Sequence, residues 1–399
     1  MSVLSTAGER RSRDAEQTRF SVAMVGTRGV PAGYGGFETC VEEVGRRLAD
    51  RGHRVRVYCR GVEPAKRLST HQGMELVHLP AMRRRTLETL SHTGLSVAHL
   101  VADRTDVALV FNCANAPWLP VLRARRIPFA THVDGLEWQR AKWGPLGQRY
   151  YRAAEKAAVR LSPALIADAG GIADYYRITH RAETNLISYG APAATGGTHR
   201  LAELDLTAEG YHLVVARFEP ENHVEEIVRG YVASSAGLPL VVVGSAPYSD
   251  RYTARVHAAA DQRVRFLGGV WDQELLDQLY VGARTYLHGH SVGGTNPSLL
   301  RAIGAGRPTH AYDVSFNREV LAESGRYFWS SAQLADQLAE AEADPAELAR
   351  RGEQARRRAA SYTWDDVADR YEELCRGLAG GRRVSPVSRR DTGVSSGRR

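Results

Sequence analysis

The chain has few cysteines, very little lysine and no hydrophobic run of membrane-spanning length. Its four cysteines are scattered and form no Cys-x-x-Cys pair, which argues against a disulfide framework and against a zinc site. No apolar stretch approaches the roughly 18 residues of a transmembrane helix. The first 19 residues are polar and lack the apolar core of a secretory signal. We therefore expect a cytoplasmic protein.

Positive charge is carried almost entirely by arginine and is unevenly placed. The formal net charge is +8, yet the segment 381–399 alone holds six arginines and one aspartate. This segment contains no aromatic residue on which a base could stack, as single-stranded nucleic-acid sites require. We therefore expect a solvated tail and no nucleic-acid partner.

Several motifs of metal and nucleotide chemistry are missing. The chain contains no Asp-x-Asp pair, no His-Glu-x-x-His sequence and no Walker A sequence. Its first glycine-rich loop does not match Gly-x-Gly-x-x-Gly, because Glu38 stands at the third glycine position. We expect chemistry without a metal and without a bound cofactor.

What the chain does have is a regular alternation of short apolar runs and helical patterns. Such alternation predicts doubly wound parallel sheets. A linker-like stretch at 190–198 divides the pattern into two similar halves, between which a cleft is expected. The predicted parts are a disordered arm (1–18), a first α/β domain (19–195), a second α/β domain (196–360), a docking helix (361–378) and a disordered basic tail (379–399). The expected strands are 22–25, 55–58, 75–79, 107–111, 127–131, 164–167, 213–216, 240–244, 264–267, 285–288 and 309–312.

The most informative segment runs from His288 to Arg301. An apolar strand enters a turn containing Gly293 and Gly294, and a helix follows in which Pro297 suits the first position. Thr295 or Asn296 can cap that helix. The start of a helix presents bare N–H groups and is suited to an anion, so this segment indicates a phosphate-bearing ligand. An ordinary capped strand–turn–helix remains the alternative.

Three further loops follow predicted strands. The loop containing Gly33, Tyr34, Gly35 and Gly36 is expected to line the cleft, or else to be a structural turn. Arg217 follows the first strand of the second half and can reach a diphosphate, although a lone arginine is often only a surface charge.

The third loop contains His132, Asp134, Glu137 and Arg140. These side chains are suited to proton transfer or to binding sugar hydroxyls. A loop anchored by Trp138 is the alternative. A separate basic run, Arg83–Arg85, precedes apolar residues at helical spacing and either meets an anionic membrane surface or is a solvated helix start.

With these loops in place, the chain resembles the GT-B glycosyltransferases of family 4, and within them a bacterial subgroup often labelled rhamnosyltransferases. The similarity spans about residues 20–375. The segments that carry it are 25–38, 134–143, 216–222, 288–300 and 312–319.

The resemblance implies two Rossmann-like domains, of which the first (19–195) is the acceptor side and the second (196–360) binds the nucleotide sugar. It also implies transfer of a sugar from that donor to a glycan, lipid-linked or natural-product acceptor, as in polysaccharide biosynthesis. Transfer would retain the anomeric configuration. By resemblance, Arg217 neutralises the donor diphosphate and residues 293–296 hold its oxygens. The 33–36 loop closes near the donor phosphates, and the 132–137 loop faces the acceptor and the transferred sugar.

One departure separates two functions. The wider family carries two glutamates eight positions apart, the second of which commonly grips the nucleotide ribose; here those positions are Gly293 and Arg301. A guanidinium has no acceptor for ribose hydroxyls. The wider family's basic residue after its arginine is also replaced, by Asn222. We expect an active transferase with an altered ribose grip, and the alternative is a catalytically silent, transferase-like binding or auxiliary protein.

Overall fold

The computed structural model describes residues 19–33, 35–61, 67–82, 87–133, 135–192, 196–244 and 250–381. Five of the sequence predictions therefore concern residues outside the described ranges. They are the N-terminal arm (1–18), most of the basic tail (from 382 on), Tyr34, Asp134 and Arg83–Arg85.

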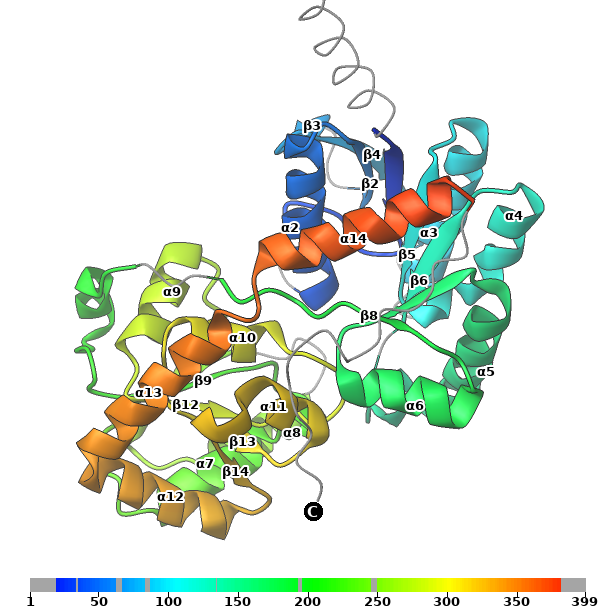
Figure 1. Cartoon of the computed structure of the whole chain (residues 1–399). Coiled ribbons are helices and arrows are strands. Elements are labelled where there is room, and N and C mark those ends of the chain that lie inside the picture. The colour runs from blue at the N-terminus through cyan, green and yellow to red at the C-terminus, as the bar shows by residue number, and fades with distance from the viewer. Residues whose placement is uncertain are drawn as a thin grey trace, which may run out of the picture.

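The first half of the chain forms one eight-stranded sheet in the order β3-β4-β2-β1-β5-β6-β7-β8 (Figure 1). All neighbouring strands are parallel except β3, which pairs antiparallel with β4. The strands are β1 (Ser21–Val25), β2 (Arg54–Arg60), β3 (Thr70–His71), β4 (Met74–Leu79), β5 (Val107–Phe111), β6 (Phe129–His132), β7 (Ala164–Ala167) and β8 (Asn185–Leu186). The helices are α2 (Gly36–Asp50), α3 (Glu88–Ala102), α4 (Leu119–Ala124), α5 (Pro145–Leu161) and α6 (Gly170–His180).

The second half forms a six-stranded, all-parallel sheet in the order β11-β10-β9-β12-β13-β14. The strands are β9 (His212–Val215), β10 (Leu240–Val243), β11 (Val264–Gly268), β12 (Thr285–His288), β13 (Thr309–Tyr312) and β14 (Gly325–Phe328). The helices are α7 (Val224–Ala233), α8 (Asp250–Ala258), α9 (Gln273–Gly282), α10 (Pro297–Gly304), α11 (Ser315–Leu321), α12 (Ser331–Ala343) and α13 (Pro345–Ala359). The two parallel sheets confirm the predicted α/β class.

Burial on both faces explains why these strands read as nearly continuous apolar runs. In β5 all five residues are buried, and in β10 all four are. The stripe of Val41, Val44 and Leu48 lies on the buried side of α2, against the sheet. The unpredicted strands are β3 and β8, which have two residues each, and β14, whose sequence Gly-Arg-Tyr-Phe carries a weak strand signal.

The last helix, α14 (Trp364–Ala379), returns from the second half to the first and lies across the α2 side of its sheet (Figure 1). Its first turn is capped by Thr363, whose hydroxyl accepts from the Asp366 N–H at 3.1 Å. Arg51 of α2 pairs with Asp369 and Glu372 of α14 at 2.7 and 2.6 Å. The helix therefore ties the two halves together.

Across the described ranges, the search for a helix both long and apolar enough to cross a membrane gives no candidate. Those same residues contain no group of three or more histidine, cysteine or carboxylate side chains arranged to hold a metal ion.

Candidate active site

The loops that follow β9 and β12 lie side by side because these strands are neighbours in the sheet. The Ser291 N–H and hydroxyl both donate to the carbonyl oxygen of Glu221, at 2.9 and 3.0 Å. Gly289 lies so close to the carbonyl of Asn222 that a Cβ there would overlap it. The predicted Arg217 segment and the predicted phosphate loop thus form one continuous rim.

Helix α10 begins as its sequence predicts. The Asn296 side chain caps it by accepting from the Ser298 N–H at 2.9 Å, and Pro297 occupies the first helical position. Gly36, at the start of α2 in the other domain, lies close enough that a Cβ would stand 3.4 Å from Pro297. The starts of α2 and α10 therefore face each other across the domain boundary.

The turn before α10 is held by the first domain. The Thr295 hydroxyl donates to the backbone carbonyl of Asp168 at 2.6 Å, and Asp168 follows the carboxyl end of β7. A Cβ on Gly294 would overlap the Asp168 carboxyl, and one on Gly135 would overlap the Gly293 backbone. The glycines at 135 and 294 are thus required by close contact between the two domains.

Burial raises the pKa of Asp168 to about 7. The Tyr189 hydroxyl opposes this shift by hydrogen bonding, whereas the nearby charge of Glu319 adds to it. Glu319 itself accepts from the Gly170 N–H at 2.8 and 3.0 Å, so it caps α6 from the opposite domain. A carboxyl that is partly protonated near neutral pH repels an anion at α10 less than a full carboxylate would.

His132 ends β6 and is buried among aromatic rings, stacked on Phe111 at a centroid distance of 5.5 Å and edge-on to Phe37 at 4.9 Å. Burial lowers its pKa to about 4, with a smaller opposing contribution from the Val133 backbone. No other side chain in the described part of the chain hydrogen-bonds to either ring nitrogen. His132 is therefore a neutral imidazole at physiological pH.

Glu137 lies in an ion-pair cluster. Its carboxylate pairs with Arg140 and, at 2.7 Å, with Lys142, and it accepts from the Trp143 ring N–H at 3.3 Å. Burial by itself would raise the pKa of Glu137, but the two cations outweigh it and keep the pKa below its ordinary value. Glu137 is therefore an ionised anchor for its loop, and an ionised carboxylate has no proton to donate.

Arg140 reaches from this loop to the second domain. Its Nη1 lies 3.3 Å from the Glu221 carboxylate, and its side chain is only 13% exposed. Its Nη2 lies 3.7 Å from the place where a Cβ on Gly293 would stand. The sequence placed Arg140 in the loop but gave no sign that it crosses the cleft.

His290 lies between the two rim loops. Asn222 donates through Nδ2 to the Arg217 carbonyl at 2.9 Å, so its Oδ1 is the acceptor that faces His290 Nδ1 at 2.9 Å. This leaves His290 Nε2 as an acceptor pointing toward Gly293. Burial lowers the pKa of His290 far below its ordinary value, and the charges of Arg140 and Arg217 lower it further.

Arg301 lies in the second turn of α10 and points toward α9. It pairs with Asp277 at 3.5 Å and lies over the Tyr280 ring at 5.8 Å. With the Gln273 amide turned so that its oxygen faces the guanidinium, that oxygen accepts from Arg301 Nη2 at 2.8 Å. The cation is therefore neutralised within its own domain, and its role in donor binding stays a prediction.

The described glycines of the 33–36 loop differ in backbone conformation and in surroundings. Gly35 has a φ of 121° and precedes α2, where a side chain would be strained. Gly33 has open space around its Cα and lines a cavity of about 300 Å³ at the carboxyl ends of β1, β2 and β4. Polar side chains of this cavity include Arg28, Glu38, Arg60 and His78.

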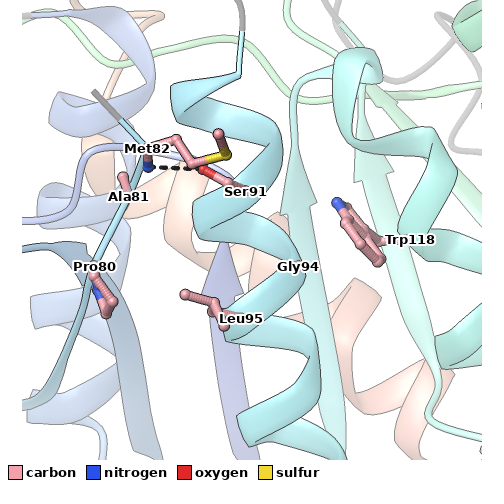
Figure 2. A pocket seen from close by; sticks show the side chains of 7 residues that line it. All are labelled: Pro80, Ala81, Met82, Ser91, Gly94, Leu95 and Trp118. Atoms are coloured by element: carbon pink, nitrogen blue, oxygen red, sulfur yellow. Dashed lines mark hydrogen bonds between the residues drawn. The ribbon is translucent and has the colours of Figure 1, made fainter. Parts of the chain in front are cut away.

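A second hollow lies on the first domain between the end of β4 and helix α3 (Figure 2). It measures about 620 Å³, and the exposed side chains of Met82 and Leu95 stand at its rim with Trp118 behind α3. The Trp118 ring N–H donates to the Leu90 carbonyl at 2.9 Å, so its one polar group has a partner within the domain. We call this feature the α3 groove, and its lining residues are Pro80, Ala81, Met82, Ser91, Gly94, Leu95 and Trp118.

Family models match both halves of the chain. Residues 35–190 match the glycosyl transferase 4-like domain, and residues 203–358 match the glycosyl transferases group 1 domain. The chain belongs to these glycosyltransferase families. Its bacterial rhamnosyltransferase-like subgroup stays a prediction.

Solved structures share the GT-B fold of this glycosyltransferase. The sucrose-phosphate synthase of Thermosynechococcus elongatus superimposes with a TM-score of 0.80 at 21% identity, covering 91% of this chain and all of that one. The Anabaena protein HepE, solved in complex with UDP-glucose, gives a TM-score of 0.73 at 15% identity over 90% of this chain and all of its own. At these identities the likeness shows the fold.

Curated relatives match a shorter stretch. The GtfA subunit of a Streptococcus gordonii UDP-N-acetylglucosamine–peptide N-acetylglucosaminyltransferase is 28% identical over 136 residues, which is 32% of this glycosyltransferase chain and 26% of the relative. An Escherichia coli O-antigen chain mannosyltransferase B is 24% identical over 131 residues, or 31% and 34% of the two chains. The matched region thus spans about a quarter to a third of these relatives.

Proposed function

We propose that the protein transfers a sugar from a nucleotide-sugar donor to a glycan, lipid-linked or natural-product acceptor, with retention at the anomeric carbon. The observation that carries this proposal is the start of α10. Its N-terminal turn lies at the junction of the two domains, on the same rim as Arg217, in a chain whose two halves both match glycosyltransferase models. The structures of HepE with UDP and UDP-glucose support a nucleotide sugar as the donor class.

In this proposal the second domain holds the donor diphosphate. The backbone N–H groups of the turn 293–296, which leads into α10, and the guanidinium of Arg217 stabilise the charge that develops on the leaving diphosphate, and the α10 dipole adds to this. Retention follows if the acceptor hydroxyl attacks from the face that the diphosphate leaves, with a diphosphate oxygen taking the hydroxyl proton. The C1–oxygen bond to the diphosphate breaks as the new C1–oxygen bond forms, and the proton leaves on the nucleoside diphosphate.

The loop 132–137 faces that reaction from the first domain. His132 is neutral and packed among aromatic rings, so it supports the loop without carrying charge, and the ionised Glu137 fixes the loop through Arg140 and Lys142. Positioning and charge stabilisation therefore carry the rate. We propose a metal-independent reaction on the ground that the sequence contains no Asp-x-Asp pair.

The α3 groove suggests how an acceptor reaches the site. Residues 81–160 carry thirteen lysines and arginines against six acidic residues, and they include Arg83–Arg85, which directly follow the groove residue Met82 in the sequence. An exposed apolar groove within a cationic segment is suited to an anionic membrane, whose hydrocarbon chains enter the groove. We propose that this face contacts the membrane carrying a lipid-linked acceptor.

Liposome co-sedimentation tests the membrane contact. Vesicles containing anionic lipid are expected to retain the wild-type protein, and Arg83→Ser/Arg84→Ser/Arg85→Ser and Leu95→Asp are each expected to reduce retention several-fold. Exposed Ile178→Asp, on α6, is the matched control and should bind as wild type does. Unchanged binding by both the triple-arginine variant and Leu95→Asp would remove the proposal.

The silent alternative rests on Arg301, which places a cation where the wider family has its ribose-binding glutamate. A panel of nucleotide sugars separates the two functions by thermal shift, donor hydrolysis and product identification. An active transferase is stabilised by its donor and releases nucleoside diphosphate slowly in water. No response to any donor would favour the silent, auxiliary protein.

A further inference from the structure

The expected diphosphate site has a cation fewer than the wider family provides, because Asn222 replaces its second basic residue. In the structure, the Asn222 side chain makes hydrogen bonds within the protein. It joins the Arg217 carbonyl to His290 and so fixes the geometry of both rim loops. Neither of these two bonds brings a positive charge to a phosphate.

A second arginine reaches the same place from the other domain. The charges of Arg140 and Arg217 both lower the pKa of His290, so each domain contributes a guanidinium whose field reaches this side chain. Arg140 crosses the boundary to Glu221, which neighbours Asn222 in the rim. Gly293 leaves the space in which the Arg140 guanidinium and His290 Nε2 lie, 3.7 and 2.8 Å from the position of its missing Cβ.

We propose that Arg140 supplies the missing cation, binding the donor diphosphate across the cleft from the first domain. This inference rests on the proposed function and goes beyond it, because it makes complete phosphate binding depend on closure of the two domains. Glu137 and Glu221 hold the guanidinium in place before the donor arrives. Both carboxylates are nearly buried, with 10% and 5% of their side chains exposed, so the guanidinium is preoriented rather than mobile.

An alternative role for the same contacts is a purely mechanical one, in which Arg140 only joins the domains through Glu221. The two roles differ in what Glu221 does. If Arg140 is a link, removing the Glu221 charge weakens the site as much as removing Arg140 does. If Arg140 binds phosphate, removing that charge frees the guanidinium for the ligand and diphosphate affinity is kept or improved.

The test measures calorimetric affinity for UDP, GDP, ADP and dTDP and for their matched nucleosides. Arg140→Gln is expected to weaken the diphosphate that wild type binds by about 10- to 100-fold, as loss of a charged hydrogen bond implies, with the nucleoside unchanged. Arg140→Lys should recover part of the loss, and Glu221→Gln should lose none. Arg177→Gln is the matched control, since Arg177 is an exposed arginine of α6 in the same domain that pairs with Asp174 and has no part in the proposed site.

Folding is followed by thermal melting, and the double variant Arg140→Gln/Glu221→Gln avoids leaving the Glu221 carboxylate buried and unpaired. Three results would overturn the assignment of Arg140 while leaving the proposed function in place. Arg140→Gln could weaken diphosphate and nucleoside binding equally, or it could keep wild-type affinity. Glu221→Gln could also lose as much affinity as Arg140→Gln does. Failure of wild type to bind any of the four diphosphates would overturn both.

Discussion

Arg301 places a positive charge where the family resemblance leads us to expect a glutamate. Its guanidinium is held by Asp277 and Gln273 of α9, so the charge reversal at this position is absorbed by neighbours in the same domain. The helix therefore folds normally around it, with Leu299, Leu300, Ala302 and Ile303 all buried. What changes is the ribose side of the expected nucleotide site, where a donor replaces an acceptor.

Restoring an acceptor at this position should strengthen nucleotide binding. Arg301→Glu alone would set two carboxylates side by side, so the variant is paired with Asp277→Asn. We expect Arg301→Glu/Asp277→Asn to bind its nucleoside diphosphate about tenfold more tightly, because hydrogen bonds to a charged group contribute about 1.5–3 kcal/mol. Calorimetry against Asp277→Asn alone measures the gain, and weaker or equal binding would contradict a ribose role for residue 301.

Asp168 should give the protein a pH-dependent stability. Its pKa is about 7 in the folded protein and about 3.9 when unfolded. Between those values the folded state keeps a proton that the unfolded state has lost, so this carboxyl makes the fold less stable as pH rises from 4 through 7. Asp168→Asn keeps the backbone contact to Thr295 and removes the titration.

The stability difference between Asp168→Asn and wild type should shift in favour of the variant by about 2–3 kcal/mol from pH 5 to pH 8. Urea unfolding at both pH values measures it, and the exposed Asp174→Asn serves as the control. A difference that stays constant with pH would show that Asp168 does not keep its proton.

These residues also mark the limit of sequence-based prediction. The sequence predicted the capping of α10 by Asn296 and the position of Arg217 after a strand, because residues close in the sequence determine where a helix starts and where a strand ends. Asp168, Glu319 and the reach of Arg140 were missed as site residues. Each acts on the opposite domain, and no spacing along one chain predicts which loops meet across a cleft.

At the scale of elements, the turn before α10 is closely constrained by contacts with the first domain. The Gly294 Cα faces the Asp168 carboxyl and the Ile172 side chain, and Thr295 is tied to the Asp168 backbone. A methyl group at 294 must push the start of α10 away from β7. The geometry of the expected anion site therefore depends on Gly294 more than on the Asn296 cap of α10.

Gly294→Ala should reduce transferase activity at least 100-fold, because displacement of catalytic groups by about 1 Å can cost that much. Steady-state kinetics and thermal melting are measured together. Gly144→Ala is the control, since Gly144 has a φ of −71° and open space around it. Activity within a few-fold of wild type in Gly294→Ala would show that the turn tolerates a side chain and is not the anion site.

Most strands of the fold followed from the sequence, and the three that did not are either two residues long, as β3 and β8 are, or weak in apolar residues, as β14 is. The eleven predicted strands all exist, since buried parallel strands are apolar throughout. β8 was missed because two residues give no periodicity, and its place was set by pairing with β7 instead. Tertiary pairing, and not local propensity, decides such edge strands.

At the scale of the whole molecule, α14 joins the domains and should contribute to their shared stability. Trp364 is 7% exposed and packs on Gly190, where the chain passes from the first domain to the second. We expect Trp364→Ala to lower the free energy of unfolding by about 3–5 kcal/mol. Chemical denaturation checks this against Trp329→Ala, whose ring is 65% exposed; equal effects of the two would contradict an interlocking role for α14.

The central claim is that the two domains hold a nucleotide sugar with its diphosphate at the start of α10. A crystal structure with the donor selected by the nucleotide-sugar screen tests it most directly. The account predicts diphosphate oxygens within hydrogen-bonding distance of the 293–296 backbone and of the Arg217 guanidinium. A diphosphate lodged elsewhere, with the start of α10 contacting only protein, would contradict it.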